Sequence, residues 1–326
     1  MQALTEADLM LANFRRDFQY YAPRALKIRT KKGAIAPLML NRAQMYVHQR
    51  LEQQYERTRK VRAYILKGRQ QGMSTYVGGR YYWRSSGEIG KRVYILTHRA
   101  DATANLFGMV KRYHEYCPAP IKPSTGRSNL DELVFDKLDS SYYVATAGAQ
   151  GTGRSATAQF FHGSEMAFWR DPAEHLAGLG QVIPDMEGTE MIFESTGNGM
   201  ANEFYNRWED AKRGRSEYEP IFVPWMWQEE YTRPVHPEFE LDDDEVEYMN
   251  GYGCTLEQMA WRRNKINSDL RGDVSLFDQE YPAIDALAFM RVVGQVLLRP
   301  AWVARAKVPK PDLEDKGPLI MGVDPA

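Results

Sequence analysis

The stretch YILKGRQQGMST, residues 64–75, predicts a strand, a tight polar loop and the start of a helix. Such a loop binds phosphate when glycines let backbone N–H groups converge on the anion and the helix points its positive end at it. Gly68 and Gly72 meet the first need, and the helix that follows meets the second. Ser74 or Thr75 supplies a hydroxyl for Mg²⁺, so the stretch has most parts of a phosphate loop.

The positive charge of a phosphate loop is displaced in this sequence. Met73 stands where such a loop normally carries lysine, whereas Arg69 lies at the start of the loop and Lys67 directly precedes it. Either cation can swing over the phosphates, and arginine offers a bidentate fork for their oxygens. We therefore predict that Arg69 takes the cationic role, with Lys67 as the alternative. The motif alone fits equally well a strand–turn–helix corner with an incidental arginine.

Composition is typical of a soluble globular protein. The chain has 326 residues, 43% hydrophobic and 26% charged, with a net charge of −1, which suits one large domain and a smaller one. Cys117 and Cys254 indicate a reducing compartment and form no metal-ligand cluster. No apolar run approaches the ~20 residues that span a bilayer, and residues 1–18 do not resemble a signal peptide. The balanced charge still permits a local basic face.

Strand and helix patterns alternate along most of the chain. Helices are predicted over residues 4–20 and from about Asn41, with a basic loop at 29–37. Short apolar runs predict strands at VRAYILKG, KRVYILTH, SYYVATAG, AQFFHGSE, EMIFEST and YEPIFVPW. This alternation predicts an α/β fold with a mainly parallel sheet and helices on both faces. Capping-box spacing at Thr255 and Gln258 indicates a small helical subdomain near the C-terminus.

Two further segments place candidate site residues at strand ends. AQFFHGSEMAFW ends its apolar run in Ser164 and Glu165, where a P-loop ATPase usually has Asp-Glu. Glu165 keeps the position of a general base, since α/β sheets gather ligand chemistry at the carboxyl ends of their strands; the alternative is an exposed strand-end acid. MIFESTGNGM runs into the loop Ser195–Asn198, which either approaches a γ-phosphate or is a plain turn.

The order of these motifs resembles a known family. The matching segments, which extend over nearly the whole chain, are LNRAQ, GRQQGMST, VYILTHRADATANLF, GTGRSATAQFFHGSEMAFW, FESTGNGMANEFYNRW, CTLEQMAWRRNKI, FDQEYPAIDALAFM and GVDPA. They resemble the large terminase subunit of tailed bacteriophages, the motor that packages DNA into procapsids. No single motif is decisive, but their joint order and spacing are specific. The resemblance implies a RecA-like P-loop ATPase of the ASCE class with a small helical lid subdomain, and ATP and Mg²⁺ as cofactors.

The resemblance also implies roles for individual residues. Gln44 matches an adenine-recognising glutamine, the alternative being a surface helix residue. The nucleotide-binding loop would comprise Lys67, Gly68, Arg69, Gln70, Gln71, Gly72, Met73, Ser74 and Thr75. Ser164 and Glu165 match Walker B, with Glu165 as the catalytic carboxylate and both joining Ser74 at Mg²⁺, partly through water; the serine departs from the family pattern. The motif that couples hydrolysis to lid movement would be Ser195, Thr196, Gly197 and Asn198.

Two more residues are assigned only through the resemblance. Arg154, in GTGRSATA, is similar to an arginine supplied to a neighbouring subunit's ATP; the alternative is a loop arginine that binds a carbonyl or a DNA phosphate. GVDPA resembles the first strand of the family's RNase H-like nuclease, where Asp324 would be a metal ligand in an intact domain. Because such a nuclease needs several carboxylates, we expect no nuclease activity in this polypeptide.

The resemblance divides the chain into four regions. Residues 1–60 would form an N-terminal and adenine-side segment, and residues 61–227 the ATPase core. Residues 228–316 would form a helical lid or linker subdomain, and residues 317–326 the start of a nuclease domain.

The expected partners follow from the same resemblance. They are double-stranded DNA gripped through its phosphates, the portal protein, the small terminase subunit and further copies in a homo-oligomeric ring. RYYWR, Arg80–Arg84, is a candidate DNA contact, although its helical pattern places part of it in the core. The isolated chain is expected to be a monomer in the host cell cytoplasm, away from membranes and not a permanent part of the virion. Two alternatives remain open, a helicase-like DNA-dependent ATPase and a non-hydrolysing nucleotide-binding scaffold.

Overall fold

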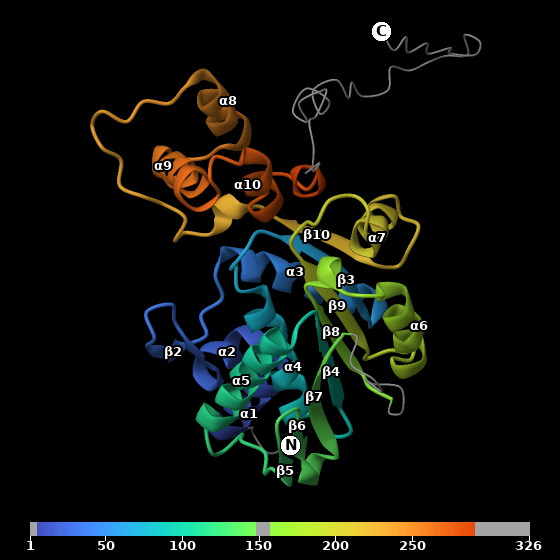
Figure 1. Ribbon diagram of the computed structural model, residues 1–326. Helices are drawn as coiled ribbons and strands as arrows, with labels where there is room; N and C mark the ends of the chain where they lie inside the picture. The colour runs from blue at the N-terminus through green and yellow to red at the C-terminus, as the bar shows by residue number, and fades with distance from the viewer. Residues whose placement is uncertain (1–4, 148–156, 291–326) are drawn as a thin grey trace, which may run out of the picture. The chain divides into compact units, whose positions relative to one another are not determined.

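The computed structural model describes residues 5–147 and 157–290. Within these ranges, eight strands form one sheet in the order β10-β3-β9-β8-β4-β7-β6-β5 (Figure 1). The strands are β3 (Val61–Lys67), β4 (Arg92–Thr97), β5 (Arg127–Ser128), β6 (Glu132–Phe135), β7 (Ser140–Thr146), β8 (Phe160–Ser164), β9 (Glu190–Ser195) and β10 (Glu219–Val223). Pairing is parallel from β10 to β7 and antiparallel only where β6 and β5 extend the edge. The predicted fold class is therefore confirmed.

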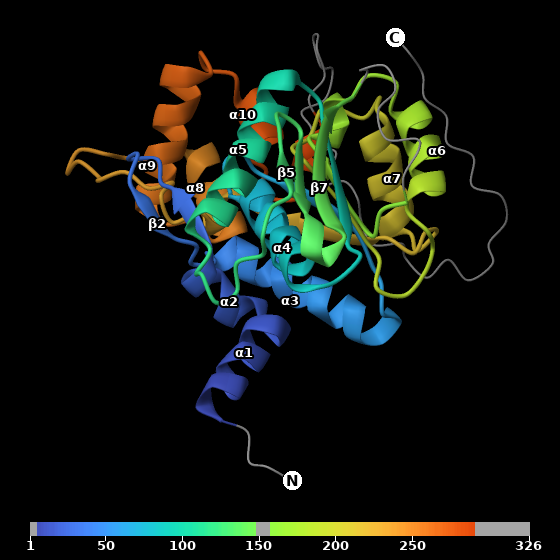
Figure 2. The same cartoon turned by 90° about the horizontal axis from the view of Figure 1, so that it is seen from below.

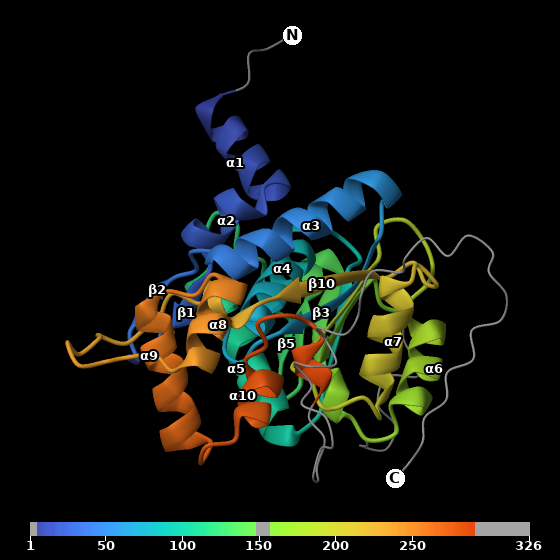
Figure 3. The same cartoon turned by 90° about the horizontal axis from the view of Figure 1, so that it is seen from above.

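Helices cover both faces of this sheet. Figure 3 shows α3 (Arg42–Thr58), α4 (Met73–Gly87) and α5 (Ala100–Tyr116) on one face, and α6 (Pro172–Val182) and α7 (Glu203–Lys212) on the other. Alternate side chains of one strand enter the two resulting cores, as Phe160 and Phe161 of β8 do. This double burial explains why the strands read as continuous apolar runs. No helix in the described ranges is long and apolar enough to cross a membrane.

The N-terminal segment differs from the prediction in two ways. The single helix expected over residues 4–20 is divided into α1 (Glu6–Arg16) and α2 (Phe18–Ala25), because the Asp17 side chain accepts the Tyr20 N–H and caps a new helix. Figure 2 shows α2 nearer the sheet than α1, and Phe14 of α1 packs against Tyr20 and Tyr21 of α2. The expected basic loop contains an antiparallel pair, β1 (Lys27–Arg29) and β2 (Ile35–Pro37).

The helical subdomain has its own apolar core. Its helices are α8 (Asp243–Tyr252), α9 (Leu256–Asn264) and α10 (Val274–Glu280). Trp225, Met259 and Phe277 are buried in this core, and the predicted capping box of Thr255 and Gln258 opens α9. The subdomain is joined to the phosphate-loop region by backbone, since the Arg69 N–H donates to the Glu280 carbonyl at 2.9 Å.

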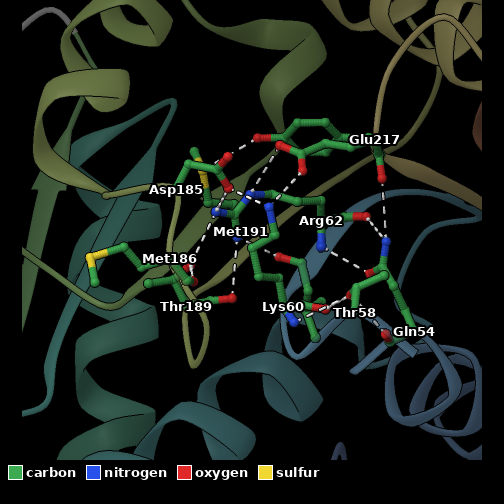
Figure 4. Close-up of polar contacts among 11 residues, drawn as sticks. Gln54, Thr58, Lys60, Arg62, Asp185, Met186, Thr189, Met191 and Glu217 are labelled. Carbon is green, nitrogen blue, oxygen red and sulfur yellow. Dashed lines mark hydrogen bonds and ion pairs between the residues drawn. The ribbon is translucent and has the colours of Figure 1, made fainter. Parts of the chain in front are cut away.

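A polar cluster holds the amino end of β3, the end away from the candidate site (Figure 4). Arg62 is buried there and donates through Nη2 to Thr189 Oγ1 at 3.0 Å. Gln54 of α3 exchanges two hydrogen bonds of 2.9 Å with the Arg62 backbone. Asp185 and Glu217 lie 3.6 and 3.5 Å from the guanidinium. These contacts fix β3 between its neighbours and so position the loop at its other end.

The RYYWR segment belongs to the core. Arg80 is buried, and its Nε lies 2.8 Å from Oε2 of Glu190 at the start of β9. Tyr81 and Tyr82 are fully buried, and Arg84 also pairs with Glu190. The expectation that part of this segment lies in the core is confirmed, and its buried members are excluded as DNA contacts.

Candidate active site

The loop between β3 and α4 has the shape that its sequence predicts. Gly72 takes a left-handed conformation with φ of 76° and begins α4. The Gly68 N–H donates to Gln71 Oε1 at 2.7 Å, and Gln71 Nε2 donates to the Pro224 carbonyl at 2.7 Å. A Cβ at Gly72 would lie 2.7 Å from Gln44 Nε2. Glycine is needed at this position for both backbone conformation and close approach.

Gln44 holds this loop from α3. Its Nε2 donates to the Gly72 carbonyl at 2.7 Å, and its Oε1 accepts the Asn41 N–H at 3.0 Å. Both ends of the amide are therefore engaged with the protein, although the residue lines the cavity described next. Recognition of adenine by Gln44 stays a prediction, and loop support is the role that its contacts display.

A cavity of about 490 Å³ lies against the loop. The predicted site residues that line it are Gln44, Lys67, Gln70, Gln71, Gly72, Met73, Ser74, Thr75 and Glu165. Arg29 and Lys31 from the N-terminal hairpin line its rim, and Lys31 pairs with Glu230 at 2.5 Å. Residues from several separate parts of the chain thus meet around one cavity.

Lys67 is the buried cation of this site. Its Nζ lies 2.6 Å from Glu165 Oε1 and 3.2 Å from Glu194 Oε2, and its side chain is 7% exposed. Burial opposes its charge, but the two carboxylates outweigh that effect and raise the pKa of Lys67. The ammonium group therefore stays charged beside the cavity.

Arg69 faces elsewhere. Its guanidinium pairs with Glu280 at the end of α10, its side chain is 59% exposed, and it is not among the cavity residues. Tyr231 also donates to the Arg69 carbonyl at 2.6 Å. The loop arginine thus links the phosphate-loop region to the helical subdomain, in an arrangement that the loop sequence alone does not reveal.

The three residues that open α4 have distinct environments. Met73 is 1% exposed and packs in the apolar core. Its thioether carries no charge, unlike the lysine usual at this position. Ser74 donates through Oγ to Glu194 Oε1 at 2.7 Å, whereas Thr75 Oγ1 lies 3.6 Å from the Met109 sulfur. Of the two predicted hydroxyls, Ser74 is the one directed at the acidic cluster.

Glu165 sits at a sharp turn after β8. Its φ of 53° lies in the left-handed region, a conformation that costs a non-glycine residue about 1 kcal/mol or more. The turn is anchored because the Glu165 N–H donates to the Glu194 carbonyl at 2.7 Å. The carboxylate is 25% exposed, which leaves it accessible from the cavity.

The predicted coupling loop contacts this carboxylate. The Thr196 N–H and the Ser195 hydroxyl donate to Glu165 Oε2 at 3.3 and 3.4 Å. Asn198 Nδ2 donates to the Ala167 carbonyl at 3.0 Å, just beyond the turn. On its other side, Gly197 is so close to the short segment Leu287–Phe289, which follows α10, that a Cβ would lie 1.8 Å from the Ala288 carbonyl oxygen. One loop therefore contacts both the candidate base and the segment that leads out of the helical subdomain.

Glu194 is a site residue that sequence reasoning missed. It is fully buried and accepts hydrogen bonds from Ser74 and Ser164 at Oε1, at 2.7 and 2.8 Å. Burial opposes its ionisation, but Lys67 outweighs that effect and lowers the pKa of Glu194. The available signal was an acid inside the apolar run MIFES, since a buried carboxylate needs partners. Arg154 and Asp324 lie outside the described residues.

The donor set around the cavity suits the predicted metal. Ser74 and Glu165 line the cavity, and the buried Ser164 and Glu194 join them in one cluster of hydroxyl and carboxylate oxygens. Mg²⁺ prefers such oxygen ligands and usually keeps several waters beside one or two carboxylates. The residues therefore fit Mg²⁺ bound with a nucleotide.

Comparison with solved structures bears on the fold. The large terminase of bacteriophage HK97 matches with a TM-score of 0.53 and 13% identity, over 84% of this chain and 53% of that one. The Thermus phage P74-26 large terminase ATPase domain matches with a TM-score of 0.47 and 17% identity, over 74% of this chain and 92% of that one. The large terminase of thermophilic bacteriophage D6E matches with a TM-score of 0.45 and 10% identity, over 65% of this chain and 50% of that one. The last two likenesses are too weak to support an argument.

No known protein-family profile matches the chain. The chain spans about half the length of the HK97 protein, and its likeness to that protein is one of fold. The fold implied by the sequence resemblance is thereby confirmed: this chain shares the fold of a phage large terminase.

Proposed function

We propose that this chain is an ATP-hydrolysing motor domain that drives double-stranded DNA into a procapsid, as part of a terminase large subunit. The observation that carries the proposal is Glu165, a carboxylate at a cavity wall, held by Lys67 at 2.6 Å and by the loop that also contacts the segment after α10. A binding scaffold has no need of an anchored, partly exposed base in a strained turn.

ATP phosphates would bind at the N-terminus of α4. Backbone N–H groups of the loop and the positive end of the helix favour an anion there. Lys67 supplies the nearest buried charge, so we assign it the cationic role, with Arg69 as the alternative. Mg²⁺, when bound, would neutralise phosphate charge. The residues to hold it are Ser74, Ser164 and Glu165, partly through water.

Glu165 would orient the attacking water and accept its proton during in-line displacement at the γ-phosphate. Loss of the phosphate then changes the surroundings of Glu165, and Ser195 and Thr196 are in contact with that carboxylate. Gly197 abuts Ala288 in the short segment that follows α10, so movement of this loop would reach the helical subdomain through that segment. ATP hydrolysis would in this way move the helical subdomain.

The partners in this role are double-stranded DNA, the portal protein, the small terminase subunit and further copies of the chain in a ring, in the host cell cytoplasm. DNA would be held through its phosphates, which makes binding insensitive to sequence and strongly dependent on salt.

Hydrolysis by the wild-type chain and by Glu165→Gln, at high protein concentration and with double-stranded DNA, tests the proposal. We expect Glu165→Gln to lose roughly 10²- to 10⁴-fold in rate, the contribution of a general base. The exposed Glu187, changed to Gln, serves as the matched control and should retain the wild-type rate. An unchanged rate in Glu165→Gln would overturn the assignment, and strand separation by the wild-type chain would favour the helicase alternative.

A further inference from the structure

Glu194 joins three elements of the site through one carboxylate. It belongs to β9, whereas its partners are Lys67 at the end of β3, Ser74 in the first turn of α4 and Ser164 at the end of β8. His162 of β8 is also buried, with Nε2 3.5 Å from Oε1. The proposed mechanism assigns Glu165 to the water but leaves this second acid without a task.

A simple ion pair does not account for this arrangement. Lys67 already has Glu165 at 2.6 Å, and burying a second carboxylate beside it is costly unless hydrogen bonds compensate. Those hydrogen bonds come from two hydroxyls, and both reach the same oxygen, Oε1. Ser74 lines the cavity, so the carboxylate fixes the direction of a group that faces the nucleotide site.

Strand register explains why this acid stands where it does. Ser164 occupies the position where the Walker B pattern expects aspartate, and a serine cannot bring negative charge there. Ser164 pairs directly with Glu194 across the parallel strands β8 and β9. The neighbouring strand therefore places its carboxylate at the level where β8 lacks one.

We propose that Glu194 is a positioning residue that replaces the missing aspartate of β8, orienting the Ser74 hydroxyl for Mg²⁺ and supplying the negative charge that holds the metal with its nucleotide. The inference rests on the proposed ATPase function and divides the work between two acids. Glu165 acts on the attacking water and reaches the metal partly through water, whereas Glu194 acts on the metal through Ser74 and Ser164.

The test measures binding instead of turnover. A fluorescent ATP analogue is titrated into the wild-type chain, Glu194→Gln and the exposed control Glu187→Gln, each with EDTA or with increasing Mg²⁺. We expect Glu194→Gln to bind as the wild type does in EDTA but to lose about 10- to 100-fold of the affinity gained from Mg²⁺, the effect of one charge-assisted hydrogen bond. Glu187→Gln should keep the full Mg²⁺ gain.

A double variant tests whether the carboxylate can be moved from β9 to β8. Ser164→Asp combined with Glu194→Gln returns the carboxylate to β8, and we expect it to restore the Mg²⁺ concentration at half-maximal binding. A merely structural role of Glu194 would not predict this recovery. If Glu194→Gln alone fails to fold in a thermal melt, the double variant, which keeps two carboxylates in the cluster, decides the question.

The outcomes separate the two claims. Nucleotide binding that is absent from the wild-type chain would overturn the proposed function, and this inference with it. Mg²⁺-dependent binding by the wild type that is unchanged in Glu194→Gln would overturn this inference alone. A folded double variant whose nucleotide binding does not depend on Mg²⁺ would likewise contradict the claim that Glu194 replaces the missing aspartate of β8.

Discussion

Lys67 and Arg69 are close neighbours in sequence, yet they lie in different environments. Lys67 is buried between Glu165 and Glu194, whereas Arg69 pairs with Glu280 of the helical subdomain. We predict that Lys67→Ala weakens ATP binding by about 10- to 100-fold, because it removes a charge-assisted contact in a desolvated site. Arg69→Ala should leave affinity within about threefold, as expected for an exposed pair. Calorimetric titration of both variants with a non-hydrolysable ATP analogue provides the measurement.

Folding of each variant is checked by circular dichroism, since Lys67→Ala leaves two carboxylates facing each other. A larger loss of affinity in Arg69→Ala than in Lys67→Ala would contradict the prediction and restore the sequence-based assignment of Arg69.

The same pair illustrates what sequence reasoning could reach at this scale. Gly68, Gly72 and Ser74 were predictable because the backbone of a phosphate loop demands them locally. The direction of Arg69 depends on Glu280, which lies far away along the chain and approaches only in the folded protein. Glu194 is hidden for a similar reason, because its partners come from three other elements and its own segment reads as an ordinary buried strand.

At the scale of elements, local patterns predicted the sheet well and the N-terminal region less well. Strands buried on both faces produce apolar runs that are visible in sequence, and β3, β4, β8 and β9 were found in this way. The break between α1 and α2 was missed because Asp17 also fits a helix interior until its side chain caps the second helix.

The coupling loop offers a test at the same scale. In Gly197→Ala the new Cβ would overlap the Ala288 carbonyl oxygen, so the loop or the segment Leu287–Phe289 must shift. We predict a loss of about 1–3 kcal/mol in the free energy of unfolding, as for overpacked sites, measured by urea denaturation. ATP hydrolysis in this variant should also respond less to DNA, because the contact between loop and subdomain is altered.

Gly108→Ala in α5 is the matched control. A Cβ at Gly108 meets nothing within 4 Å, so alanine should be neutral or stabilise the helix by up to about 1 kcal/mol. Equal stability of Gly197→Ala and the wild type would show that the loop and the subdomain separate freely.

At the scale of the whole molecule, the charges around the cavity bear on assembly. Lys67 is committed to two carboxylates, and Lys31 at the rim pairs with Glu230. Phosphoryl transfer gains ~10³-fold or more when an additional arginine stabilises the developing negative charge. We propose that Arg154 of a neighbouring subunit supplies this arginine, so an isolated chain should hydrolyse ATP slowly.

Mixing two inactive variants tests this arrangement. Glu165→Gln lacks its base but still donates Arg154, whereas Arg154→Ala keeps its base and needs a neighbour's arginine. An Arg154→Ala subunit beside a Glu165→Gln subunit would therefore have a complete site, and we predict that the mixture hydrolyses ATP faster than the sum of the separate variants. A mixture of Glu165→Gln with Lys67→Ala, both defective within their own sites, should show no recovery. A wild-type rate in Arg154→Ala alone, or equal rates in the two mixtures, would exclude a shared site between subunits.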